Sequence, residues 1–267
     1  MTVENQTAGP TYLFGDTDVA AARLRLLAEV FAPSTREFLG RLGVDCARRV
    51  VDLGCGPGYT TRLIAEVFPQ AVVLGLDSSP HFISLARQTP TERVEFVIAD
   101  VTASLPSGPY DLIYARYLLT HIARPREAIA SWSKQLSKGG VIAIEENEWI
   151  HTTQPAFARY LEIVEAMLAN GGQRLYIGAE LAREQTWASM TVVHSEVVPL
   201  AARDSDTARM FVMNIANWRH QPYIERKFAT SEIDSLRTEL ERLTQVDQNA
   251  SSIQFGQRRL ALARDKT

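Results

Sequence analysis

Three glycines alternate with other residues in the stretch VVDLGCGPGYT, residues 50–60, which begins with an apolar run. A glycine turn between a strand and a helix lets a ligand approach the backbone and its N–H groups. The dinucleotide fingerprint GxGxxG needs a third glycine where this chain has Tyr59, and no GK[ST] of a phosphate-binding loop follows. The turn therefore offers no phosphate site, and a plain tight turn without a ligand stays an alternative.

Acidic residues follow the next two apolar runs. Asp77 ends LGLD, 25 residues after Asp52, and Asp100 ends VIAD. An acid at the tip of a second strand can bind both hydroxyls of a ribose. Asp100 can accept a hydrogen bond from an adenine amino group while the N–H of Val101 binds a ring nitrogen. The pattern favours a nucleoside without phosphates as the ligand.

The elements that must position these residues alternate between short apolar runs and amphipathic segments. The helix patterns are TTRLIAEVF, PHFISLARQ and PREAIASWSKQL. Ser79-Pro80 predicts a helix start, and Lys138-Gly139-Gly140 predicts a helix end before the next strand. The alternation predicts an α/β fold with a parallel, doubly wound sheet. The first five predicted strands are residues 50–53, 71–76, 94–99, 110–115 and 140–146.

Three longer helical segments interrupt this alternation. Residues 11–45 predict leading helices, and residues 155–185 and 205–245 predict helical insertions, the first of them broken at Gly171-Gly172. We interpret residues 1–267 as one domain in which these segments roof the strand tips as a lid. A roof excludes water and large substrates, so it suits a small, partly apolar metabolite. Two further strand candidates are residues 190–200 and 253–263.

Composition narrows the class of protein. The chain has 267 residues, 46% of them hydrophobic, and a net charge of −3, which does not suit a nucleic-acid-binding surface. Its two cysteines, Cys46 and Cys55, form neither a CxxC unit nor a disulfide framework. No apolar run is long enough to span a membrane, and the first residues lack the pattern of a signal peptide. We expect a cytoplasmic protein without nucleic-acid partners and leave a homodimer open.

Taken in order, the motifs resemble those of a known family. VVDLGCGPGYT, LGLDSSP, VIADV, YDLIYARYLLTHI and LSKGGVIAIEE are similar to the motifs of class I S-adenosylmethionine-dependent methyltransferases, in the bacterial small-molecule branch that includes the quinone-biosynthesis type. They cover roughly residues 48–148. The resemblance implies a Rossmann-like, doubly wound sheet of seven strands, mostly parallel with an antiparallel last strand. It also implies S-adenosyl-L-methionine as the cofactor and a small-molecule methyl acceptor.

The resemblance also implies a set of cofactor contacts. The methionine part would lie over Gly54, Gly56 and Gly58, with Arg116 just below it. The ribose would bind Asp77, and the adenine would bind Asp100 and Val101. The remaining residues of the expected cofactor site are Asp52, Cys55, Tyr59 and Ser78, with Tyr12 and Arg23 as partners for the cofactor's carboxylate.

The tip of the fourth strand reads Ala115-Arg116-Tyr117-Leu118. Nucleic-acid amino-methyltransferases place [DN]PP[YF] there, and metal-dependent catechol-type enzymes place an aspartate. Arg116 therefore argues against base methylation and against a metal ion. A divalent ion held by Glu145, Glu146 and Asn147 stays an alternative.

Two residues after the fourth and fifth strands are candidate catalytic groups. His121 could orient or deprotonate the acceptor, or serve as a structural histidine. Glu146 is expected at the mouth of the pocket together with Trp149. A protein of the same fold that catalyses a rearrangement stays open, whereas Tyr59 disfavours a nucleotide-dependent oxidoreductase. Aromatic and apolar residues could line the acceptor pocket or form plain core: Phe157, Tyr160, Met167, Trp218 and Tyr223.

Overall fold

The protein is built on one seven-stranded sheet with the strand order β3-β2-β1-β4-β5-β7-β6. The computed structural model describes residues 13–265 except 107, 185, 188–189 and 247–249. Strands β1 to β5 pair in parallel, and β7 runs antiparallel to both β5 and β6. The predicted α/β, mostly parallel fold is therefore confirmed. The strands are β1 Arg49–Leu53, β2 Val72–Asp77, β3 Val94–Ile98, β4 Tyr110–Arg116, β5 Leu136–Thr152, β6 Met190–Ala202 and β7 Ile253–Arg264.

Helices cover both faces of the sheet because almost every residue in its central strands is apolar. Phe38 of α1 and Ile64 of α2 pack on one face, against Val50 and Leu112. Helices α4 and α6 pack on the other face, which includes Leu53. The helices beside the parallel strands are α1 Asp18–Gly40, α2 Tyr59–Val67, α3 Pro80–Arg87, α4 Pro125–Ser133 and α6 Ile177–Arg183, with a short 3-10 turn at Leu119–His121.

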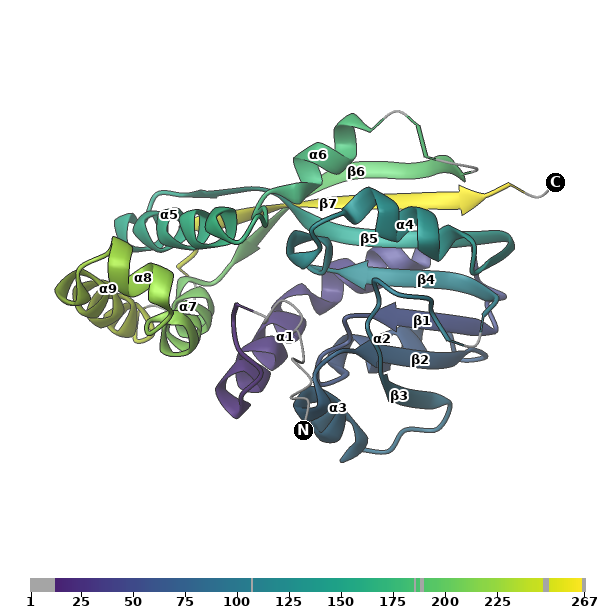
Figure 1. Ribbon diagram of the computed structural model, residues 1–267, viewed down its shortest axis with the longest axis horizontal. Coiled ribbons are helices and arrows are strands. Elements are labelled where there is room, and N and C mark those ends of the chain that lie inside the picture. The colour runs from purple at the N-terminus through teal and green to yellow at the C-terminus, as the bar shows by residue number, and fades with distance from the viewer. Residues whose placement is uncertain (1–12, 107, 185, 188–189, 247–249, 266–267) are drawn as a thin grey trace, which may run out of the picture.

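A second hydrophobic core lies beside the far ends of the long strands β5, β6 and β7, at the left of Figure 1. It contains Phe157 and Trp218 from the helices and Phe255 from β7. Phe31 of α1 also belongs to it, whereas Phe38 of the same helix packs on the sheet, so α1 joins the two cores. The helices of the second core are α5 Pro155–Asn170, α7 Asp204–Trp218, α8 Pro222–Lys227 and α9 Thr230–Leu243.

The structure corrects one predicted boundary. Lys138-Gly139-Gly140 does not separate a helix from a strand, because α4 ends at Ser133 and β5 already begins at Leu136. Gly139 has a φ of 75°, and the β4–β5 register shifts between Tyr110 and Leu112. The glycine pair thus serves an irregularity inside the strand.

Two other features follow the sequence. Gly171 and Gly172 end α5: the N–H of Gly172 bonds to the carbonyl of Ala169, and the N–H of Gln173 bonds to that of Leu168. Among the helices described, none has both the length and the hydropathy that a membrane crossing requires.

Candidate functional site

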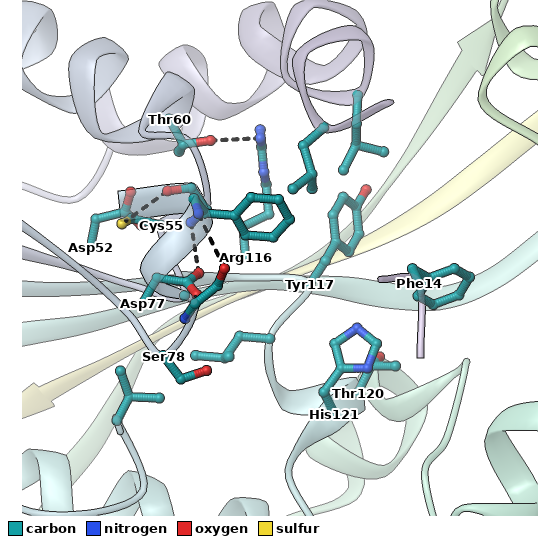
Figure 2. Close-up of a pocket in the computed structure, with 18 of the residues that line it drawn as sticks. Phe14, Asp52, Cys55, Thr60, Asp77, Ser78, Arg116, Tyr117, Thr120 and His121 are labelled. Carbon is teal, nitrogen blue, oxygen red and sulfur yellow. Dashed lines mark hydrogen bonds between the residues drawn. The ribbon is translucent and has the colours of Figure 1, made fainter. Parts of the chain in front are cut away.

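A cavity of about 490 Å³ opens at the carboxyl ends of the parallel strands, beneath α1. Its volume lies in the range of about 300–1,000 Å³ typical of small-molecule sites. The strand order reverses between β1 and β4, which is where open α/β sheets bind ligands. Figure 2 shows the polar groups of the strand tips on one side of this cavity, and Phe14 and His121 on the other. Following the expectation from the sequence, we call the side of the strand tips the cofactor end and the side of Phe14 and His121 the acceptor end.

The glycine turn after β1 forms one wall of the cofactor end. Gly54, Gly56 and Gly58 all have positive φ, at 67°, 53° and 80°. A Cβ on Gly54 would lie 2.8 Å from Leu118 Cδ1, so only glycine lets the neighbouring loop approach this closely. Gly54 and Gly56 line the cavity together with Cys55 and Tyr59. Gly58 lies behind them against Phe96 and caps the start of α2.

The Asp77 carboxylate links the glycine turn to the start of α3 by two hydrogen bonds. Its Oδ2 accepts a hydrogen bond from the N–H of Gly56 at 2.8 Å, and its Oδ1 accepts one from the N–H of Ser79, also at 2.8 Å. Burial raises the pKa of the Asp77 carboxyl above its ordinary value, while the two N–H groups favour its charged form. Both Asp77 and Ser78 line the cavity. The predicted ribose acid therefore lies beside the glycine turn.

The tip of β3 completes the cofactor end. Asp100 and Val101 both line the cavity. The exposed Asp100 carboxylate accepts hydrogen bonds from the N–H and the hydroxyl of Thr102, at 2.8 and 2.7 Å. The carbonyl of Val101 accepts one from Trp132 Nε1 at 2.7 Å. These bonds fix the turn that would face an adenine ring.

Asp52 and Arg116 bring a buried acid and a half-buried guanidinium to the lining of the cavity. Asp52 accepts a hydrogen bond from Thr61 Oγ1 at 2.6 Å, and burial raises its pKa to about 7 although Arg116 favours the charged form. Arg116 donates from Nη2 to Thr60 Oγ1 at 2.7 Å and from Nη1 to Thr35 Oγ1 at 3.1 Å. Thr35 belongs to α1, so the helix above the cavity positions this guanidinium.

The two acids at the end of β5 lie behind the cavity. Glu145 is fully buried, and its carboxylate accepts hydrogen bonds from Tyr114 and from Thr35 Oγ1, the latter at 2.7 Å. Its other oxygen lies 3.7 Å from Arg259 Nε. Neither Glu145 nor Glu146 lines the cavity. No group of three or more possible metal-binding side chains occurs in the described part of the chain.

Glu146 does not lie at the pocket mouth, where the sequence placed it. The side chain is fully buried and accepts hydrogen bonds from the N–H of Leu119 at 2.6 Å and from Thr120 Oγ1 at 3.2 Å. Burial raises its pKa to about 8. Neighbouring residues of a strand point to opposite faces, so Glu146 faces the loop after β4 while Glu145 faces α1. In this position Glu146 holds the loop that carries His121.

His121 lies at the acceptor end and lines the cavity. Its ring meets Phe14 edge-on at 5.9 Å between centroids. Burial, together with the charge of Arg23, lowers the pKa of His121 to about 4, so the imidazole is neutral near pH 7. Arg23 lines the same part of the cavity with its guanidinium 5.3 Å from the Phe14 ring centre. Tyr12, the other expected carboxylate partner, lies outside the described residues.

The helical segments contribute unequally to the roof. Leu168, Gln173 and Leu175 of the 155–185 segment line the cavity, but no described residue of 205–245 does. The latter segment instead supports the chain before α1, where Gln221 Nε2 donates to the carbonyl of Leu13 at 2.6 Å. The five residues weighed as acceptor-pocket aromatics or core belong to or pack against the second core: Phe157, Tyr160, Met167, Trp218 and Tyr223.

Comparison with known proteins identifies the family of the chain. A family model described as a methyltransferase domain matches residues 45–194, more than half of the chain. The chain belongs to this methyltransferase domain family. Trans-aconitate 2-methyltransferase from Azoarcus sp. (strain BH72) is 40% identical over 112 residues, 42% of this chain and 44% of that protein. The enzyme of the same name from Methylobacterium nodulans is 35% identical over 126 residues, 47% of this chain and 48% of that protein.

This methyltransferase domain protein thus spans less than half the length of the curated relatives it matches. Solved structures share its fold over more of the chain. One chain from the complex of the Haloferax volcanii Trm112 methyltransferase activator with a methyltransferase superposes with a TM-score of 0.62 and 17% identity, over 97% of this chain and 100% of that one. The plantazolicin methyltransferase BpumL, in complex with SAH, superposes with a TM-score of 0.54 and 17% identity. This match covers 95% of this chain and 92% of that one. At this identity the likeness shows the fold alone.

Sequence reasoning did not single out several cavity residues of the methyltransferase domain protein. Tyr117 lines the cavity in a left-handed backbone conformation, with a φ of 52°, which costs a non-glycine residue on the order of 1–3 kcal/mol. The sequence signal that could have indicated Tyr117 as a cavity residue is its place directly after Arg116, at a strand tip. The other residues came from distant or unremarkable positions, among them Phe14, Leu24, Leu27, Phe31, Leu168 and Phe255.

Proposed function

We propose that this protein transfers a methyl group from S-adenosylmethionine to a small, partly apolar metabolite. The observation that carries the proposal is the cofactor end of the cavity, where Asp77 lies against the glycine turn and next to the Asp100-Val101 tip. These groups suit a ribose and an adenine, and Tyr59 stands where a dinucleotide site needs its third glycine. Membership of the methyltransferase domain family supports the same ligand.

The residues present fit each part of S-adenosylmethionine. Asp77 would bind the ribose hydroxyls, and Asp100 and Val101 the adenine. The glycine turn would receive the amino-acid head, whose carboxylate would extend towards Arg23 on the Phe14 side of the cavity. Asp52 adds a buried acid that suits a cationic ligand. When bound, the cofactor would supply an electrophilic methyl group on a positively charged sulfur, and this sulfur is a good leaving group because it departs as a neutral thioether.

The chain's own contribution is then to orient the acceptor and exclude water. Phe14, Leu168 and Phe255 give the acceptor end an apolar surface, and the neutral imidazole of His121 can orient the acceptor by a hydrogen bond at a ring nitrogen. No metal ion is needed, because the leaving group is already activated by its charge. We expect the enzyme to work in the cytoplasm.

A thermal-shift experiment tests the ligand. A ligand that binds only the folded state stabilises it by about 2.7 kcal/mol at a hundred times its dissociation constant. Each kcal/mol raises the melting temperature of a domain of this size by roughly 2–4 °C. Saturating S-adenosylhomocysteine should therefore raise it by several degrees, whereas NAD, NADP and ATP leave it unchanged. A shift from NAD alone would contradict the methyltransferase proposal.

Turnover tests the reaction. The protein is incubated with S-adenosylmethionine and a panel of acceptors: trans-aconitate, which names the relatives' activity, together with a phenol, a neutral carbonyl compound and a primary amine. Mass spectrometry then detects S-adenosylhomocysteine and the methylated product. Binding of the cofactor with conversion of a substrate but without S-adenosylhomocysteine would favour the alternative, a non-methyl reaction such as a rearrangement on the same fold.

A further inference from the structure

Tyr117 stands at the junction of the two ends of the cavity. Figure 2 shows its ring between Arg116, on the side of Asp77 and Ser78, and Phe14 with His121 on the other side. The ring meets Phe31 of α1 edge-on at 5.7 Å between centroids, and the Arg116 guanidinium lies 5.9 Å from its centre. An acceptor that attacks a methyl group presented from the cofactor end must pass this side chain.

The backbone holds Tyr117 in place at a cost. Its φ of 52° is rare for a bulky residue. Its N–H donates to the carbonyl of Glu145 at 2.9 Å, and two residues later the N–H of Leu119 donates to Glu146 Oε1 at 2.6 Å. Leu118, between them, packs against Gly54. Strained residues persist where their surroundings hold them this firmly, and they concentrate at functional sites.

A chain of hydrogen bonds sets the direction of the Tyr117 hydroxyl. Arg259 Nη2 donates to Ser34 Oγ at 2.7 Å, because a guanidinium can only donate. Ser34 Oγ in turn donates to Gln257 Oε1 at 2.9 Å, which leaves Gln257 Nε2 facing the Tyr117 hydroxyl oxygen at 3.5 Å. An amide nitrogen only donates, so the phenol oxygen accepts in this contact and Gln257 does not use the phenol proton. Burial raises the pKa of Tyr117, so the phenol keeps that proton.

We propose that Tyr117 is a catalytic residue that touches the methyl acceptor: its hydroxyl donates a hydrogen bond to an oxygen of the acceptor, and its ring sets the line of attack on the methyl group. The inference rests on the proposed methyl transfer and narrows its substrate. The acceptor carries an oxygen with a lone pair to accept this bond, as a carboxylate, a carbonyl or a phenolate does.

The experiment removes the hydroxyl alone. Tyr117→Phe is compared with the parent, using the panel acceptor that the parent turns over fastest. We expect kcat/KM for the acceptor to fall about 3- to 10-fold, the value of one hydrogen bond, with an unchanged dissociation constant for S-adenosylhomocysteine. Tyr160→Phe is the matched control, since its phenol also accepts from an amide, Asn214 Nδ2 at 2.6 Å, but lies outside the cavity. It should leave kcat/KM unchanged.

A second pair of variants distinguishes the effect of the Tyr117 ring on activity from the effect of its backbone conformation on stability. Tyr117→Ala and Tyr117→Gly both remove the ring and should both lower kcat/KM by about a hundredfold, the effect of a misplaced reactant. Glycine tolerates the left-handed conformation and alanine does not, so the glycine variant should melt at the higher temperature of the two. A merely structural role would make activity follow stability across this pair.

Three results overturn the inference. The first is an equal kcat/KM for Tyr117→Phe and the parent. The second is a loss of S-adenosylhomocysteine affinity that accounts for the whole effect, which would make Tyr117 a wall of the cofactor end only. The third is a fastest acceptor without any oxygen. If the parent binds S-adenosylhomocysteine but methylates no acceptor, the proposed function fails, and the role of Tyr117 fails with it.

Discussion

The two ends of the cavity are built in different ways. The cofactor end is polar and comes from the tips of neighbouring strands, with Asp52, Asp77 and Asp100 each ending or following a short apolar run. The acceptor end is largely apolar and comes from segments far apart in the chain, such as Phe14 and Phe255. The difference teaches that one sheet edge is enough to gather the residues of the proposed cofactor site, whereas the proposed acceptor site depends on how the second core packs. The ligand specificity of one end can therefore change while the ligand specificity of the other end stays the same.

Removing the acid at the tip of β2 gives the largest expected effect. Asp77→Ala removes the carboxylate proposed to bind both ribose hydroxyls and should weaken S-adenosylhomocysteine binding on the order of a hundredfold, measured by calorimetry. His121→Ala is the comparison at the acceptor end and should leave that affinity unchanged. An Asp77→Ala protein that binds as tightly as the parent would remove Asp77 from the site and with it the contrast between the ends.

Glu146, the buried carboxyl that holds the loop after β4, should make the stability of the protein depend on pH. Burial raises the pKa of Glu146 from 4.5 to about 8, so the folded protein binds this proton more tightly than the unfolded chain does. The stabilising contribution is complete below the unfolded pKa and is lost as the pH rises through the folded pKa. Between about pH 5 and about pH 8, the free energy of unfolding of the parent should fall by roughly 1–3 kcal/mol relative to Glu146→Gln.

Urea unfolding of both proteins at each pH measures this difference. His121 titrates in the opposite sense: its lowered pKa means that stability is lost as the pH falls below its ordinary value of 6.5 towards about 4. Because both proteins retain His121, its contribution cancels in the comparison. If the free energies of unfolding of the two proteins changed with pH in the same way, the pKa of Glu146 would be the same in the folded and unfolded states. That result would contradict the prediction.

The glycine pair after α5 sharpens the comparison at the acceptor end. Gly172 has a φ of 71°, so alanine there is strained by about 1 kcal/mol and should lower the melting temperature by roughly 2–4 °C. Gln173 and Leu175 would shift with it, so the acceptor KM should rise a few-fold while S-adenosylhomocysteine affinity stays constant. Gly171, with a φ of −85°, provides the matched control, because alanine is tolerated there. An unchanged KM would reduce the pair to an ordinary helix end.

Chelation should have the smallest effect. Arg116 stands at the strand tip where metal-dependent relatives place an acid, and Glu145 is engaged by Thr35, Tyr114 and Arg259. Treatment with EDTA should leave the rate of S-adenosylhomocysteine formation unchanged. A rate that is lost with EDTA and restored by magnesium would place a metal ion in the cavity and change the interpretation of the acceptor end.

Local pattern was enough to predict which strand-tip residues meet at one edge of the sheet. The alternation of strands and helices specified the parallel part of the sheet, and the carboxyl ends of parallel strands share one edge. Residues that end such strands must therefore meet, whatever the rest of the chain does. This is why Gly54, Asp77 and Asp100 could be expected together from their positions, with Arg116 added by the family resemblance, and all four line the cavity.

Only the tertiary structure decided the acceptor end. Whether Glu146 faces the cavity or the loop depends on the side of β5 to which it points and on what packs there, and the sequence placed it at the wrong location. Phe255 reaches the cavity because β7 extends beside β5, and Tyr117 because Glu145 and Glu146 hold the loop in a strained conformation. Such contacts join residues many positions apart. Short motifs carry no record of them, because packing rather than local backbone preference brings these residues together.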